Sequence, residues 1–128
     1  MRVGTLIHER ILKNPCTMRP IAPASPEEIV VENTLYGWEL RLRRELVPCE
    51  GEAVARYLAA FARMGFIEVP VPNDPRVIEA VVEDLERSVA ELTKHIESEI
   101  SGELNPSRHK QIFFIYTYIL QIYINFFF

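Results

Sequence analysis

Glycine is scarce in this sequence, and its scarcity excludes the common nucleotide-binding motifs. The 128 residues contain five glycines, none of them grouped, so neither a phosphate-binding loop nor a dinucleotide-binding fingerprint is present. The motifs of serine hydrolases and protein kinases are missing as well. We therefore predict that the protein is not an enzyme and that it uses no cofactor.

Positive charge and cysteine are also in short supply. Lysine and arginine number 14 against 18 aspartates and glutamates, and the net charge of −4 argues against sequence-independent binding of nucleic acid, although it leaves room for a local basic patch. The two cysteines, Cys16 and Cys49, lie in proline-containing segments without a second pair of metal ligands beside them. We interpret them as free thiols of an intracellular protein, and we predict a cytoplasmic location and no metal site.

The three histidines are far apart, which leaves little material for a catalytic or metal centre. Glu91 and His95 are four residues apart, and we interpret them as a solvated pair on one helix. Cys49 precedes a predicted helix, where a thiolate can be stabilised, but no histidine is near it in the sequence. A further acidic face, which we interpret as solvated, consists of Glu79, Glu83 and Glu86.

A chain of this length has room for one domain. We divide it into an irregular N-terminal segment (residues 1–24), an α+β domain (25–104) and an apolar tail (105–128). Residues 1–12 favour a short strand over a short helix, and their apolar run is too short for a secretory signal. Residues 13–24 contain three prolines and predict an irregular connector.

The α+β domain begins with a helix-start signal and continues with an alternating segment. Residues 25–28, Ser-Pro-Glu-Glu, are typical of a helix N-terminus, although the β-branched residues after them favour a short helix or none. Residues 36–43 alternate with a period of two, which predicts a strand with one buried face. The apolar residues of that face are Tyr36, Trp38, Leu40 and Leu42.

A second helix and a second strand follow. Residues 52–64 are rich in alanine and leucine and predict a helix, which Gly65 is suited to terminate. Residues 66–71 predict a strand, and Pro70 indicates that it lies at a sheet edge. We expect one small sheet containing this strand and the strand near 36–43, arranged either as a parallel crossover unit or in antiparallel fashion.

The clearest pattern in the chain predicts an amphipathic helix over residues 75–101, with Asp74 as its N-cap and Pro75 at its first position. About 26 residues span roughly 39 Å, more than the core of such a small domain needs. We therefore predict a protein–protein interaction module that forms a coiled-coil-like dimer, or contacts another protein, through this helix. The predicted contact face, called the association stripe below, consists of Ile78, Val82, Leu85, Val89, Leu92 and Ile96.

Three arginines near the end of the strand 36–43 form a weak basic patch: Arg41, Arg43 and Arg44. Such a patch is a candidate for phosphate contacts. Glu39 and Glu45 flank it, however, and charged residues on neighbouring strands commonly pair with one another. We interpret the arginines first as partners in cross-strand ion pairs.

The order of elements in the second half of the chain resembles that of winged-helix regulators. Helix 52–64, the turn at Gly65, the edge strand 66–71 and the long helix correspond to the recognition helix, wing and dimerising helix of that family. The resemblance implies a DNA-binding regulator as an alternative function. The strand upstream departs from the family, which has helices there, and the helix 52–64 offers only Arg56 and Arg63 as phosphate contacts.

The composition changes abruptly after Arg108-His109-Lys110, and residues 111–128 read QIFFIYTYILQIYINFFF. Three interpretations of this tail are open. Residues 112–128 fit a short C-terminal membrane anchor, with the basic triplet and the body of the protein on the cytoplasmic side. Alternatively the tail packs back as a buried helix or strand. The third interpretation is a reading-frame artefact, because the tail uses residues with A/T-rich codons and the body uses residues with G/C-rich codons.

Overall fold

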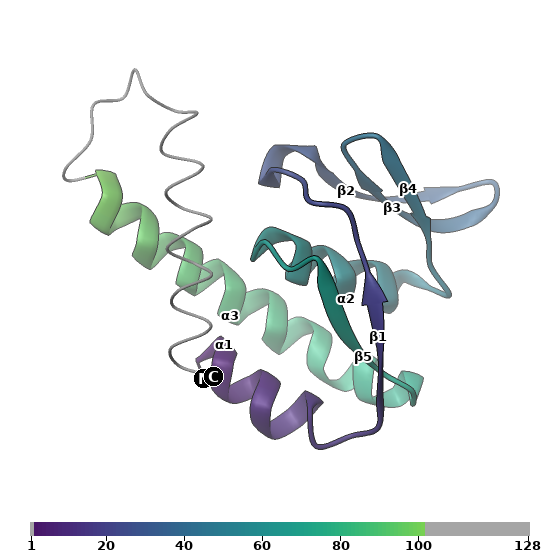
Figure 1. Cartoon of the computed structure of the whole chain (residues 1–128), viewed down its shortest axis with the longest axis horizontal. Coiled ribbons are helices and arrows are strands. Elements are labelled where there is room, and N and C mark those ends of the chain that lie inside the picture. Colours follow the sequence, from purple (N-terminus) through teal and green to yellow (C-terminus); the bar gives the residue numbers. More distant parts are fainter. Residues whose placement is uncertain (1, 102–128) are drawn as a thin grey trace.

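The structure is a computed structural model that describes residues 2–101, so the predictions for the tail lie outside the described residues. The fold is α+β, with helices and two small antiparallel sheets (Figure 1). In chain order the elements are α1 (Val3–Leu6), the π-helical turn η1 (Ile7–Ile11), β1 (Cys16–Pro20), the 3-10 turn η2 (Pro26–Glu28), β2 (Ile29–Thr34), β3 (Gly37–Leu42), β4 (Glu45–Pro48), α2 (Glu52–Arg63), β5 (Glu68–Pro72) and α3 (Pro75–Ser101).

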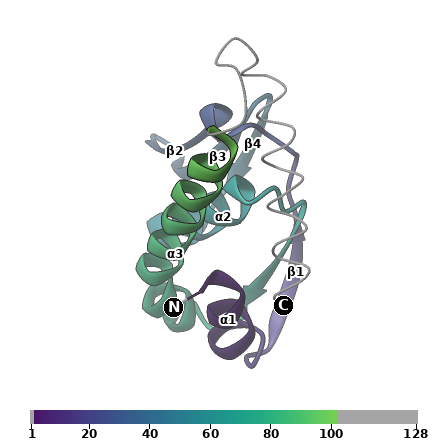
Figure 2. The same ribbon diagram turned by 90° about the vertical axis from the view of Figure 1, so that its left-hand side faces the viewer.

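Helix α2 lies at the centre of the molecule. The sheet β2-β3-β4 covers one side of it and α3 packs along another (Figures 1 and 2). Eight of its 12 residues are buried and cover most of the circumference of the helix, while Glu52, Arg56 and Arg63 lie along one narrow polar side. The largest fully buried side chains of the described chain are Leu6, Ile7, Ile11, Leu40, Leu42, Tyr57, Leu58, Phe61, Met64, Leu85 and Ile96.

The strands predicted near residues 36–43 and 66–71 both form, as β3 and β5, but they lie in two sheets rather than in the one we expect from the sequence. β3 lies between β2 and β4, and both pairings are antiparallel. β5 pairs antiparallel with β1, where Val69 faces Arg19. No parallel crossover joins β3 to β5, because the strand beside β5 comes from the N-terminal segment.

Residues 3–11 form a helical segment, α1 and η1, in place of the strand and irregular structure predicted there. The alternation of residues 3–7 is too short to be strong evidence for a strand, and the apolar residues Val3, Leu6 and Ile7 also have the spacing of one helix face. The segment packs on α3, and Arg10 of η1 reaches Asp84 (Nη1 to Oδ2, 2.5 Å) and the carbonyl oxygen of Ala80 (3.1 Å). Its buried apolar residues are Val3, Leu6, Ile7 and Ile11.

A strand, β1, also forms within residues 13–24, where three prolines predict an irregular connector. Pro15 precedes the strand and Pro20 is its last residue. The N–H of Asn73 donates to the carbonyl oxygen of Pro15 at 2.9 Å, which fixes the phase of the hydrogen bonds between β1 and β5. Because these bonds alternate along an antiparallel pair, the nitrogen of Pro20 faces away from β5 and removes no bond from the ladder.

The end signals read from the sequence are confirmed locally. Asp74 Oδ1 accepts the backbone N–H of Arg76 at 3.0 Å and caps α3, and Gly65 closes α2 with a φ of +81°. The Glu28 carboxylate accepts bonds from the backbone N–H (3.1 Å) and the hydroxyl (2.8 Å) of Ser25. That helix start yields only the turn η2, because the β-branched residues that follow enter β2.

Candidate interaction surface

The association stripe on α3 faces the core of the protein itself. From Ile78 to Val89 its residues are buried against the rest of the chain, and Leu92 packs at the margin of the core. Ile96 is buried as well, but it does not belong to this contiguous core. A partner would have to open the core to reach most of the stripe. The intermolecular contact predicted for these residues therefore stays a prediction.

Charged contacts at the border of the core further attach α3 to its neighbours. Arg56 on α2 forms an ion pair with Glu86 on α3, and this hydrogen-bonded contact raises the pKa of the guanidinium. Arg10 on η1 pairs with Asp84, and the hydrogen bond from Arg10 lowers the pKa of that carboxyl group. The N-terminal two-thirds of α3 is thus occupied by intramolecular contacts on two sides.

The basic patch is partly neutralised by its surroundings. Arg41 forms a cross-strand ion pair with Glu32 at 3.2 Å, and Arg43 lies 3.4 Å from Glu28. The pKa of Glu28 is lowered, first by the hydrogen bonds from Ser25 and to a smaller degree by Arg43. Arg43 adopts a φ of +53° in the turn between β3 and β4, and Arg44 beside it is exposed. Two of the three arginines therefore have carboxylate partners, which weakens the patch as a phosphate-binding site.

The position of α2 also argues against its use as a DNA-recognition helix. A recognition helix must present one long face to the major groove. Here α2 lies between the three-stranded sheet and α3, and Arg56, one of its two candidate phosphate contacts, is paired with Glu86. The strand after α2 pairs with β1 instead of forming a separate wing. The likeness to winged-helix regulators is thus confined to the order of elements.

Neither thiol has the surroundings of a reactive cysteine. Cys16 and Cys49 are half-buried and free, and burial is the main cause that raises the pKa of both thiols. At neutral pH they remain protonated, and a protonated thiol is a poor nucleophile. The location of Cys49 just before α2 does not produce a stabilised thiolate.

The acidic residues and histidines do not converge on a site. In the described part of the chain, no group of three or more His, Cys, Asp or Glu side chains could hold a metal ion. Glu86 is paired with Arg56, and Glu91 and His95 are both exposed on α3. A groove of about 510 Å³ runs between the N-terminal ends of α2 and α3, and its acidic residues are Glu50, Glu52, Glu79 and Glu83. Glu79 and Glu83 are exposed as predicted for the acidic face, whereas Glu86, its third member, is half-buried beside Arg56.

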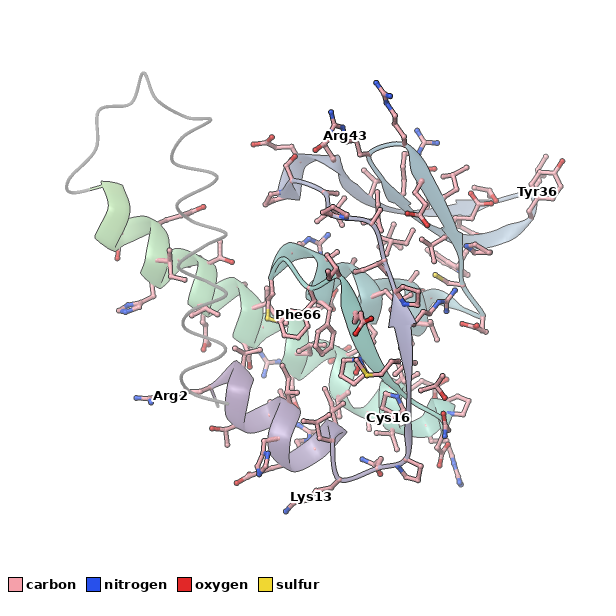
Figure 3. All side chains as sticks on the ribbon, viewed as in Figure 1. Arg2, Lys13, Cys16, Tyr36, Arg43 and Phe66 are labelled. Atoms are coloured by element: carbon pink, nitrogen blue, oxygen red, sulfur yellow. The ribbon has the colours of Figure 1, made fainter. Side chains whose placement is uncertain are left out.

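The exposed apolar side chains gather on the three-stranded sheet. Leu35 and Tyr36, in the turn between β2 and β3, are 101% and 93% exposed. Figure 3 shows Tyr36 at the far end of this hairpin, pointing away from the body, with Arg43 at the opposite end of β3. Of the seven large apolar side chains exposed within residues 2–98, four belong to this sheet and its turn: Val30, Leu35, Tyr36 and Leu46.

The alternation of residues 36–43 predicts a buried Tyr36, and this prediction is wrong. The strand begins one residue later, at Gly37, whose φ of +104° belongs to the turn. Thr34 holds this turn, because its Oγ1 accepts the N–H of Tyr36 and donates to the carbonyl oxygen of Gly37, each at 3.1 Å. The hairpin extends beyond the end of α2 (Figure 1), so a residue at its tip has no core to face. The glycine after Tyr36 is the signal that would have indicated the turn.

Prolines occupy three of the four edges of the two sheets. Each lies at a position that faces away from the neighbouring strand, where the missing N–H costs no ladder bond. Two of the outward-facing carbonyl groups also accept hydrogen bonds: Tyr57 donates to that of Pro70, and Arg19 donates to that of Pro48 at 2.6 Å. These edge residues are Pro20 on β1, Pro48 on β4, and Pro70 and Pro72 on β5.

The fourth edge, that of β2, contains no proline. The N–H of Arg43 donates to the carbonyl oxygen of Glu28 at 3.2 Å, which fixes the phase of the bonds between β2 and β3. It follows that the N–H and C=O groups of Val31 and Asn33 face outward. No hydrogen bond between residues of the described part uses these four groups. Exposed edges of this kind readily accept another strand.

No helix within residues 2–101 combines the length and the apolar character needed to cross a membrane. The membrane contact predicted for residues 112–128 concerns residues outside this range and stays a prediction.

Comparisons of the chain with models of protein families, with curated proteins and with solved structures find no match.

Proposed function

We propose that the protein is a self-association module and that its three-stranded sheet, not the association stripe on α3, provides the contact surface. The observation that supports this proposal is the exposure of Leu35 and Tyr36 at the tip of the β2–β3 hairpin. Tight turns favour glycine and small polar residues. A leucine and a tyrosine at such a tip are instead typical of protein interfaces, where tyrosine is enriched.

The exposed residues of the sheet can contribute appreciably to association. Fully burying one leucine side chain contributes about 1.5–3 kcal/mol, and part of this offsets the loss of freedom on association. In a symmetric pair, Leu35 and Tyr36 would contribute once from each chain. Val30 and Leu46 lie on either side of Arg41 on the outer face of the same sheet and extend the apolar surface.

Sedimentation velocity of the full chain over a wide concentration range tests the proposal. We expect a concentration-dependent dimer, and we expect the double variant Leu35→Ser/Tyr36→Ser to raise the dissociation constant at least about tenfold, since each tenfold step corresponds to about 1.4 kcal/mol. The matched control is Met18→Ser/Ile67→Ser, which removes two exposed apolar side chains outside this sheet and should leave the dissociation constant unchanged. A wild-type chain that stays monomeric, or a tip variant that associates as tightly as the wild type, would overturn the proposal.

A further inference from the structure

Resting on the self-association proposed above, we infer that the second copy pairs with the edge of β2, so that two three-stranded sheets join into one six-stranded antiparallel sheet around a twofold axis. Such an interface is isologous, since each chain contributes the same strand. The β2 edge is suited to it because the other three edges of the two sheets carry proline and β2 does not.

The outward groups of β2 define how the two strands can pair. Val31 and Asn33 each offer an N–H and a C=O, whereas Ile29 offers only its C=O because its N–H already donates to Pro26. When Val31 faces Val31 of the second copy, these two residues exchange two hydrogen bonds. Each Asn33 N–H then donates to the Ile29 carbonyl of the other chain, which gives four bonds in total across the axis.

Charge selects this register over its neighbours. With Val31 on the axis, Glu32 lies opposite Val30 of the second copy and retains its ion pair with Arg41. Sliding the second strand by two residues in one direction places Glu32 opposite Glu32, and like charges directly opposite each other destabilise a sheet. Sliding it the other way pairs Val31 with Ile29, whose N–H is not free. The register centred on Val31 is the one that satisfies both charge and hydrogen bonding.

The same register accounts for the exposed hairpin tip. β2 continues past the axis toward its turn, and the antiparallel arrangement brings Leu35 beside Glu27 of the second copy, in the turn η2. The two exposed tip residues would thereby be placed against the other chain. On the inner face the two half-buried Val31 side chains meet and extend the core across the axis.

Proline substitution at the edge tests the pairing. Asn33→Pro removes an outward N–H and leaves the bonds between β2 and β3 in place, and we expect it to raise the dissociation constant at least about tenfold, because two of the four bonds across the axis are lost. Met18→Pro is the matched control, because the N–H of Met18 faces outward from β1, at an edge of the other sheet. It should not change the dissociation constant. Circular dichroism checks that both variants remain folded.

Disulfide trapping tests the register without relying on the proline variant. Facing residues at a non-hydrogen-bonded antiparallel position have Cα atoms about 4.5 Å apart, which a disulfide can bridge. A mixture of Val30→Cys and Glu32→Cys chains should form a mixed disulfide under mild oxidation, and Val30→Cys alone should give no more covalent dimer than the wild type with its native Cys16 and Cys49. Mass spectrometry identifies the linked residues. Val30→Cys chains that link to each other, or that form no disulfide with Glu32→Cys chains, would overturn this register.

The two proposals fail in distinguishable ways. A wild-type chain that is monomeric at every concentration overturns both of them. A dimer that the tip variant weakens, that Asn33→Pro leaves unchanged and that yields no mixed disulfide overturns only the pairing through β2.

Discussion

The two long helices of this protein differ in how much of their surface the rest of the chain covers. α3 has 27 residues and a narrow apolar stripe, whereas α2 has 12 residues and a wider apolar face. Yet α2 is enclosed by the sheet on one side and α3 on another, while α3 is buried along one face only. The difference teaches that the width of the buried face reflects the number of neighbours: α3 buries one stripe, whereas the buried residues of α2 cover most of its circumference.

The alanines of α2 explain how it accommodates neighbours on several sides. Ala55, Ala59, Ala60 and Ala62 are all at most 4% exposed. Alanine favours helix formation, and its small side chain also lets a neighbouring element approach closely. The alanine content that indicates a helix in the sequence is therefore also a sign of close packing in the structure.

The largest effect is expected when the same leucine-to-alanine truncation is made in each of the two helices. Leu58→Ala in α2 should destabilise the fold by about 2–5 kcal/mol, because Leu58 is fully buried and the cavity would lie between packed layers. Leu92→Ala in α3 should cost about 1 kcal/mol, because Leu92 lies at the margin of the core. Urea denaturation measures both. Equal losses of unfolding free energy would contradict the central role of α2.

A smaller effect concerns the hydroxyl group that links α2 to β5. The Tyr57 hydroxyl donates to the carbonyl oxygen of Pro70, and burial raises the pKa of Tyr57, so the group stays a donor. Tyr57→Phe should destabilise the fold by about 1–2 kcal/mol, because it leaves that carbonyl without this donor. Tyr36→Phe makes the same change at the exposed hairpin tip and should stay within about 0.5 kcal/mol of the wild type in urea denaturation. A Tyr57→Phe chain as stable as its control would rule out a stabilising hydrogen bond.

The smallest expected effect concerns the ion pair between Arg10 and Asp84 at the surface of α3. The hydrogen bond from Arg10 lowers the pKa of Asp84 in the folded protein, so ionised Asp84 contributes stability above about pH 4, the ordinary pKa of aspartate. That contribution is lost as the pH falls through the lowered pKa of the folded state. Asp84→Asn should therefore lower the urea midpoint slightly at pH 6, and the difference from the wild type should shrink at pH 3. Glu91→Gln, an exposed change on the same helix, serves as the control. A difference that grows on acidification would refute this ion pair as its source.

Local sequence signals predicted much of the fold. The α+β class, the strand β3, and the helices α2 and α3 follow from patterns and end signals such as Asp74 and Gly65 that act within a few residues. The N-terminal segment did not follow, because residues 3–11 satisfy both a strand and a helix pattern over a short span. Packing of Leu6 and Ile7 on the core decided in favour of the helix.

The candidate surface was harder to predict than the fold. An exposed Tyr36 and a buried one fit the same alternation; Gly37 is the one local sign of the turn, and the end of α2 beneath the hairpin explains the exposure. The availability of the β2 edge depends on the phase of its bonds to β3, which no local pattern specifies. The prolines of the other three edges can be read from the sequence, but only the pairing of the strands shows that they face outward at sheet edges.

The sequence by itself determined where α2, α3, β3 and β5 form, because capping, proline and side-chain periodicity act between residues close in the chain. Only the tertiary structure decided that β1 pairs with β5, that α2 is the central element, and that the association stripe on α3 is covered by the chain itself. These outcomes depend on which apolar faces meet, and burial is a non-directional force that a single segment cannot specify on its own.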